Sequence, residues 1–136
     1  METPQNAKPL TILFVDDDRF LLDMYSMKFS KNNFEVHTAV GGEDALKMIR
    51  DGFEPNILLL DVVMPVMDGM ELLSIIRKED RLKKTVIIML TNQGVSDDVS
   101  KAKKLNVDGY IIKATTIPSE VLAEVQKIYA SSQKKS

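Results

Sequence analysis

The residues best suited to chemistry in this sequence stand at the ends of short apolar runs. Three consecutive aspartates, Asp16–Asp18, end the first run, and Asp61 directly follows four apolar residues. Thr91 and Lys113 end two later runs. If these runs are strands of one parallel sheet, their carboxyl ends share one edge, and open α/β sheets bind ligands outside that edge. We therefore expect carboxylates, a hydroxyl and an amine to converge on one site.

The charges of this set call for a cation. Asp16, Asp17 and Asp61 bring three negative charges, and Lys113 returns one positive charge. Carboxylates within about 4–6 Å of one another disfavour their shared ionisation unless a cation joins them. Because the ligands on offer are all oxygen atoms, we expect Mg²⁺ rather than Zn²⁺.

The same set has the parts needed for phosphoryl transfer, which is catalysed mainly by positioning and charge neutralisation. The ion could hold a phosphoryl oxygen against Asp61, with Thr91 and Lys113 on the other oxygens. An aspartate can act as the nucleophile and give an acyl phosphate. Each residue alone also has a structural interpretation: an aspartate after a strand often caps the next helix, and a threonine or lysine there is commonly a solvated loop residue. Asp61 fits that interpretation least, because a carboxylate at the edge of the core needs a partner.

The elements that must position these residues follow from the apolar pattern, in which five short runs alternate with five stretches of helical spacing. The expected strands are Thr11–Asp16, Phe34–Ala39, Asn56–Asp61, Thr85–Thr91 and Asp108–Lys113. The expected helices run from about Arg19 to Ser30, Glu43 to Arg50, Gly69 to Glu79, Ser96 to Asn106 and Pro118 to Ala130. The apolar stripes we expect to face the core are Phe20, Leu21, Met24 and Met27 in the first helix, Ala45, Leu46 and Ile49 in the second, and Leu72, Leu73 and Ile76 in the third. Alternating strands and helices predict an α/β fold with a parallel sheet covered on both faces.

Composition limits the classes of protein to consider. The 136 residues are enough for one domain, which we expect at residues 10–130, with flexible tails at 1–9 and 131–136. The absence of cysteine excludes disulfides, thiol catalysis and cysteine-based metal sites. A net charge of −2 gives no basic surface for binding nucleic acid by bulk charge. No apolar stretch is long enough to cross a membrane, so we expect a soluble, cytoplasmic protein.

The motifs resemble those of a known family, the receiver domain of two-component response regulators, over Leu10 to Ala130. They are VDDD (Val15–Asp18), LLLDVVMPVMDG (Leu58–Gly69), LT (Leu90–Thr91) and DGYIIK (Asp108–Lys113). Their order and spacing are highly specific, and the chain resembles a stand-alone receiver of the chemotaxis type. The resemblance implies a flavodoxin-like (βα)5 receiver fold, a doubly wound sheet of five parallel strands in the order 2-1-3-4-5.

The resemblance also implies roles for the residues at the site. Asp61 would accept a phosphoryl group from a histidine kinase or a histidine phosphotransfer protein in a Mg²⁺-dependent reaction. Asp17 would bind Mg²⁺ directly, Asp16 largely through a coordinated water, and the backbone carbonyl of Val63 would be the third protein ligand. The chain would then be a phosphoacceptor switch that assists its own phosphorylation and slow dephosphorylation, and not a conventional enzyme.

The output implied by the resemblance is a changed protein-binding face. Thr91 and Lys113 would grip the phosphoryl group, and Tyr110 stands where the family places an aromatic that turns inward as the threonine moves. The face is formed by the fourth helix (96–105), the fifth strand and the fifth helix. Its protein target is unknown; we expect no direct binding to nucleic acid or membrane, and a monomer or a weak phosphorylation-dependent dimer.

This sequence departs from the family at three places. Ala114 follows Lys113 where proline is usual, and Asn92 follows Thr91 where a small residue is usual. Val63 and Gln93 occupy the variable positions near the acceptor. Because an apolar Val63 cannot orient an attacking water, we expect slow loss of the phosphoryl group from Asp61.

Two other functions are consistent with parts of the pattern. A small Mg²⁺-dependent aspartyl-phosphate hydrolase would use a D-x-D motif such as Asp16 and Asp18, but it would place the nucleophile on the first strand and usually carries a cap domain. An unphosphorylated interaction module is disfavoured because the acidic pair and Lys113 are all present. The single histidine, His37, is interpreted as structural, and the methionines Met24, Met27, Met48 and Met89 as core gap-fillers.

Overall fold

Near-continuous apolar runs form the central strands of this protein, as expected where both faces of a parallel sheet are covered. The computed structural model describes residues 8–91, 106–112 and 117–134. Its elements in chain order are β1 Leu10–Asp16, α1 Arg19–Ser30, β2 Phe34–Val40, α2 Gly42–Arg50, β3 Ile57–Asp61, α3 Gly69–Lys78, β4 Val86–Thr91, β5 Gly109–Ile112 and α5 Pro118–Lys134. The strands pair in parallel in the order β2-β1-β3-β4-β5. The predicted fold class and strand order are confirmed.

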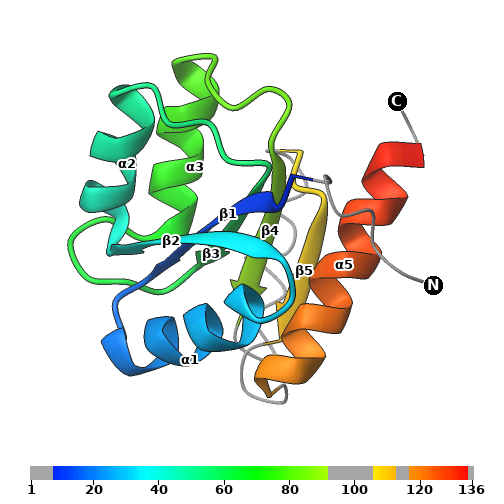
Figure 1. Ribbon diagram of the computed structural model, residues 1–136. Helices are drawn as coiled ribbons and strands as arrows, with labels where there is room; N and C mark the ends of the chain where they lie inside the picture. The colour runs from blue at the N-terminus through cyan, green and yellow to red at the C-terminus, as the bar shows by residue number, and fades with distance from the viewer. Residues whose placement is uncertain (1–7, 92–105, 113–116, 135–136) are drawn as a thin grey trace.

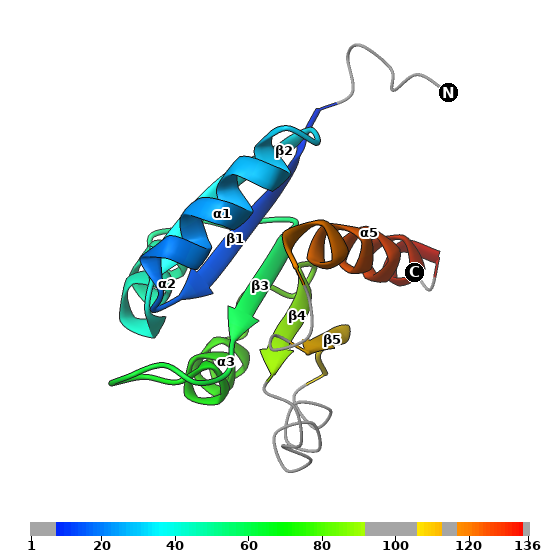
Figure 2. The same ribbon diagram turned by 90° about the horizontal axis from the view of Figure 1, so that it is seen from below.

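Helices cover both faces of the sheet, with α2 and α3 on one face and α1 and α5 on the other (Figures 1 and 2). Alternate residues of each central strand point to opposite faces. In β1, for example, Leu13 and Val15 pack with α2 and α3, whereas Ile12 and Phe14 pack with α1 and α5. This alternation decides the side of the sheet on which any residue at a strand end emerges.

Helix α1 buries a different stripe from the one predicted. Leu22, Tyr25 and Phe29 are buried, whereas Phe20 is 71% exposed and Met27 is 63% exposed. The aromatic side chains decide the outcome, since Phe14 of β1 stacks on Tyr25 at 5.3 Å between ring centroids and meets Phe29 edge-on at 4.8 Å. Aromatic pairs in these arrangements are favourable beyond the area they bury. The prediction that Phe20 and Met27 face the core is therefore wrong.

The other helices on the sheet agree more closely with the sequence. The predicted inward residues of α2 and α3 are all buried. Helix α5 begins at Pro118 as predicted but continues to Lys134, beyond the predicted end near Ala130. The segment after Ala130 contains no glycine or proline to end the helix, and Ser132 is half-buried.

Some predictions fall outside the part of the chain that the structure describes. These are most of the helix expected from Ser96 to about Asn106, the positions Asn92 and Gln93, Lys113 with the following Ala114, and most of the expected N-terminal tail. His37, by contrast, is described: its ring packs against Phe53 and contacts the Glu35 carboxylate at 2.9 Å, in keeping with its structural interpretation. Within the described ranges, no helix is both long and apolar enough to span a membrane.

Candidate metal-binding site

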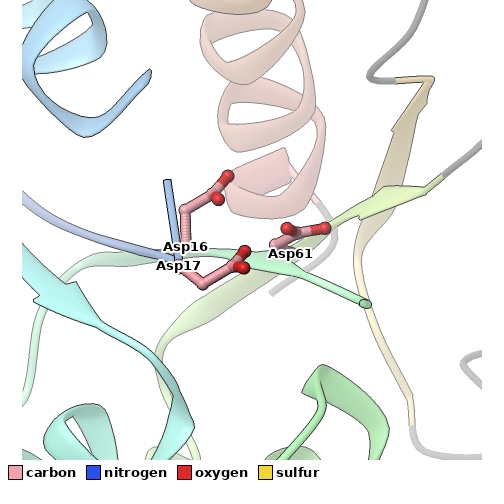
Figure 3. Close-up of side chains that lie close together, drawn as sticks. All are labelled: Asp16, Asp17 and Asp61. Atoms are coloured by element: carbon pink, nitrogen blue, oxygen red, sulfur yellow. The ribbon is translucent and has the colours of Figure 1, made fainter. Parts of the chain in front are cut away.

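Three carboxylates meet at the carboxyl edge of the sheet. Asp16, Asp17 and Asp61 each offer one oxygen, and these oxygens lie within 4.8 Å of one another (Figure 3). Asp16 is 1% exposed and Asp61 is 4% exposed, whereas Asp17 is exposed. The predicted convergence of these residues is therefore present in the structure.

Strand register brings Asp16 and Asp61 together. β1 and β3 are neighbours, with Val15 paired to Leu60, so the next residue on each strand lies at the same level of the sheet edge. By alternation, Asp16 continues the row of Ile12 and Phe14, and Asp61 continues the row of β3 residues on that same face. Both side chains consequently emerge on the α1 and α5 face.

Asp18 belongs to the helix and not to this triad. It is the N-cap of α1, and its carboxylate accepts hydrogen bonds from the backbone N–H groups of Phe20 at 3.0 Å and Leu21 at 3.3 Å. The Asp18 N–H in turn donates to Oδ1 of Asp16 at 3.0 Å. The capping interpretation thus holds for the third aspartate, while the first two face Asp61.

The donor set suits a hard divalent cation. All three side chains are carboxylates, which are the ligands that Mg²⁺ takes most readily together with water and backbone carbonyls. Two of the three are buried, where carboxylates must be compensated. The exposed Asp17 leaves one side of the triad open to solvent, as an ion that keeps several waters requires.

The loop after Asp61 is tightly constrained. Its ends are joined by a hydrogen bond from the Gly69 N–H to the Val62 carbonyl at 2.8 Å, and the Val62 N–H donates to Leu90 of β4 at 3.1 Å. At its tip the Met67 N–H donates to the Pro65 carbonyl at 2.8 Å around Val66, whose φ is +68°. A γ-turn with a positive central φ is rare and strained, especially for a β-branched residue.

Two glycines and an aspartate hold this loop, and periodicity did not mark them as site residues. A Cβ at Gly69 would lie 2.3 Å from the carbonyl oxygen of Asp61, so α3 can begin here only with glycine. The Asp68 carboxylate caps α3 by accepting from the Glu71 N–H at 2.8 Å. A Cβ at Gly42, in the first turn of α2, would lie 2.8 Å from the Met67 carbonyl oxygen. The MDG motif marks Asp68 and Gly69 in the sequence, whereas nothing in the sequence pairs Gly42 with Met67.

The predicted switch residues lie on the next two strands. Thr91 is 4% exposed and ends β4 one residue beyond Leu90, which pairs with Asp61. Tyr110 of β5 is half-buried among the side chains of the α2 and α3 face, and burial raises the pKa of its phenol. In β4, Met89 pairs with Tyr110, so Thr91 lies diagonally across from Tyr110 on one face of the sheet. Lys113, predicted to bind the phosphoryl group together with Thr91, is outside the described ranges.

The aspartate and glycine before Tyr110 have structural roles. Oδ2 of Asp108 accepts from the Ile87 N–H at 2.8 Å, and the Asp108 N–H donates to the Ile87 carbonyl at 2.8 Å, which fixes the start of β5 on β4. A Cβ at Gly109 would meet Ile128 of α5 at 2.6 Å. These contacts fix the register of β5 on β4, and so the position of Tyr110 along the sheet relative to Thr91.

Comparison with known proteins identifies the family. The family described as "Response regulator receiver domain" matches residues 12–126. The transcriptional regulatory protein AfsQ1 of Streptomyces coelicolor is 32% identical over 103 residues, which are 76% of this chain and 44% of that protein. The chain thus spans less than half the length of this relative.

Solved structures agree with the sequence match. The chemotaxis response regulator CheY4 of Vibrio cholerae is 28% identical with a TM-score of 0.79, covering 88% of this chain and 98% of the solved one. A CheY-like receiver protein from Methanospirillum hungatei is 27% identical with a TM-score of 0.81, covering 94% and 99%. A putative response regulator from Chloroflexus aurantiacus is 32% identical with a TM-score of 0.78, covering 90% and 99%. The chain belongs to the response-regulator receiver domains of two-component signalling, a family of phosphoacceptor switches.

Proposed function

We propose that Asp61 accepts a phosphoryl group from a histidine kinase or a histidine phosphotransfer protein, and that the reaction needs Mg²⁺. The observation that carries the proposal is the geometry of the triad, in which Asp61 is nearly buried and within 4.8 Å of the Asp16 and Asp17 carboxylates. A cation bound among these carboxylates would offset their mutual repulsion and the charge of an approaching phosphoryl group.

The proposed step forms one bond and breaks one. A carboxylate oxygen of Asp61 attacks phosphorus, the phosphorus–nitrogen bond of a phosphohistidine breaks, and the released imidazole nitrogen takes a proton. When bound, Mg²⁺ neutralises charge on the phosphoryl oxygens. Asp17, Asp61 and the Val63 carbonyl would hold the ion, and Asp16 would act largely through a coordinated water. Lys113 and Thr91 would bind the phosphoryl oxygens.

The proposed output is a change at β4 and β5. The phosphoryl group carries about −1.5 to −2 charges, which replace the single negative charge of the Asp61 carboxylate. Thr91 then gains a charge-assisted hydrogen-bond acceptor, and its displacement makes room for Tyr110, its diagonal neighbour on the same face. The inward turn of Tyr110 would change the shape of the proposed protein-binding face, which comprises residues 96–105, β5 and α5, and would so change its affinity for a protein target.

Exposed apolar side chains support contact with a protein phosphodonor. Among the described residues, five large apolar side chains are at least 57% exposed: Phe20, Met27, Val63, Val66 and Ile117. All except Met27, which is near the end of α1, lie in connections or helix starts at the carboxyl edge of the sheet. Apolar side chains gathered on an exposed surface mark interaction sites.

Asp18 argues against the hydrolase alternative. In a D-x-D phosphatase the second aspartate would face the substrate, but Asp18 accepts two backbone N–H groups of α1. We therefore propose a switch that assists its own phosphorylation and loses the phosphoryl group slowly, since the exposed Val63 offers no hydrogen bond to an attacking water.

Intact-mass spectrometry tests this function directly. The full chain is incubated with acetyl phosphate, and separately with a phosphorylated histidine phosphotransfer protein, with Mg²⁺ or with a chelator. We expect the mass of one phosphoryl group to be added only with Mg²⁺ and only with Asp61 present, so that Asp61→Asn is inert. Failure of the wild-type chain to gain mass from both donors would contradict the proposal.

A further inference from the structure

Two adjacent glycines begin helix α2, and the structure gives them different reasons to be glycine. Gly41 has a φ of +96°, and a Cβ there would meet nothing within 4 Å. Gly42 lies inside the helix and is buried, and a Cβ there would meet the Met67 carbonyl oxygen at 2.8 Å and the Met67 Cγ at 3.0 Å. Position 41 requires glycine because of its backbone conformation, whereas position 42 requires glycine because a side chain would clash with the loop that follows Asp61.

The contact at Gly42 cannot be relieved by a side-chain rotation. Its nearest atom is a backbone oxygen, so any side chain at position 42 must push the Met67 peptide away by about 0.6 Å to reach ordinary contact distance. The loop cannot absorb this movement locally, because its ends are joined by the Gly69 to Val62 hydrogen bond and its tip is the strained turn at Val66.

The opposite side of the same loop is pressed against the phosphoacceptor strand. At Gly69 the backbone lies so close to Asp61 that a Cβ would come within 2.3 Å of the Asp61 carbonyl oxygen. The loop is therefore wedged between the start of α2 and the backbone of Asp61, and it carries Val63, the proposed carbonyl ligand. The Val63 N–H also points to Oδ1 of Asp61 at 3.4 Å.

We propose that Gly42 is a positioning residue for the Asp61 site: its missing side chain lets α2 seat the Val62–Gly69 loop so that the Val63 carbonyl and the Asp61 carboxylate face one bound Mg²⁺. This inference rests on the proposed function of the triad. Mg²⁺ requires near-ideal octahedral geometry with ligands at about 2.0–2.1 Å, and sites tolerate misplacement of only about 0.5 Å. The displacement that a side chain at position 42 imposes is of that size.

The test compares Gly42→Ala with Gly52→Ala in the full chain. Gly52 follows the other end of α2, has a φ of +106°, and would meet nothing within 4 Å as alanine, so its substitution strains the backbone without touching the loop. Mg²⁺ affinity is measured by calorimetry, and thermal unfolding is followed for each variant. Alanine is a better helix former than glycine, so helix propensity alone predicts no loss for Gly42→Ala.

We expect Gly42→Ala to weaken Mg²⁺ binding by about 10-fold or more, the loss typical when an outer support of a metal ligand is removed. Phosphorylation by acetyl phosphate should need correspondingly more Mg²⁺, and excess Mg²⁺ should restore its rate. Gly52→Ala should lower the unfolding temperature and leave Mg²⁺ affinity unchanged. An affinity of Gly42→Ala within twofold of wild type, or an equal loss in Gly52→Ala, would overturn the inference.

A measurement on the wild-type chain covers the case in which Gly42→Ala does not fold. During a Mg²⁺ titration followed by NMR, the amide signals of Gly42 and Met67 should shift with the same midpoint as that of Val63, and the Gly52 signal should stay in place. Stationary Gly42 and Met67 signals with a moving Val63 signal would refute the positioning role while leaving the metal site intact. A chain that bound Mg²⁺ but was not phosphorylated would contradict only the proposed function.

Discussion

Replacing Asp61 with asparagine should stabilise the chain when Mg²⁺ is absent. Asp61→Asn keeps the shape of the side chain and removes one of three negative charges whose oxygens lie within 4.8 Å. At that separation, and with an effective dielectric constant of about 20, one pair of like charges repels by about 3.5 kcal/mol. Solvent at the exposed Asp17 and the loss of other Asp61 contacts reduce this gain, so we expect a net increase of about 1–2 kcal/mol in the free energy of unfolding.

Mg²⁺ should reduce or reverse the difference in free energy of unfolding between Asp61→Asn and wild type. An ion that binds only the folded chain stabilises it by about 2.7 kcal/mol at a concentration 100 times its dissociation constant, and Asp61→Asn lacks one of the ligands. Urea unfolding in a chelator and in excess Mg²⁺ measures both free energies. Asp18→Asn is the matched control, since asparagine caps helices as well as aspartate and Asp18 is outside the triad. A variant less stable than wild type in chelator would refute the electrostatic reasoning.

Three further results are expected. Val63→Asn should shorten the lifetime of phospho-Asp61 several-fold, because an exposed amide can orient water; an unchanged decay of the phosphorylated mass would count against this. Phe20→Ala should slow phosphotransfer from a protein donor but not from acetyl phosphate, and should change the free energy of unfolding by less than about 0.5 kcal/mol. Phe29→Ala, which removes a buried side chain, should lower the free energy of unfolding by about 3–5 kcal/mol. Equal slowing with both donors would exclude a docking role for Phe20. Arg50 and Arg81 form ion pairs with Glu79 and lower the pKa of its carboxyl group from 4.5 to about 2. The wild type should therefore be more stable than Glu79→Gln above pH 4.5 and should lose that advantage as the pH falls toward 2. A difference in unfolding temperature that persists below pH 2 would contradict this assignment.

The strands and the convergence of the acidic residues could be predicted because both depend on local pattern. Unbroken apolar runs predict strands covered on both faces, and a parallel sheet brings their ends to one edge. The position of Asp61 after four apolar residues and of Asp16 after its own run then places both near one another. The roles assigned to Thr91, Lys113 and Tyr110 remain predictions.

The buried face of α1 could not be predicted, because this helix has two apolar stripes at helical spacing. Phe20, Met24 and Met27 form one, and Leu22, Tyr25 and Phe29 form the other. Only the partner, Phe14 on β1, decides between them, and its contact with Tyr25 and Phe29 depends on how the helix crosses the sheet.

The contacts that Gly42 and Gly69 make with the loop after Asp61 could not be predicted for a related reason. Gly42 meets Met67 and Gly69 meets the backbone of Asp61. Both contacts join segments that are irregular or lie at helix starts, where periodicity carries no information.

The three consecutive aspartates are not interchangeable, because each has a different structural position. Asp16 continues a strand row and is buried, Asp17 faces the same cluster from the solvent side, and Asp18 is committed to the first turn of α1. Removing or adding one residue in this run would leave it acidic but would shift its carboxylates relative to β1 and α1, so that each would occupy a neighbouring residue's position. In protein engineering and in comparing relatives, the length of the run from β1 to α1 therefore carries as much information as its charge.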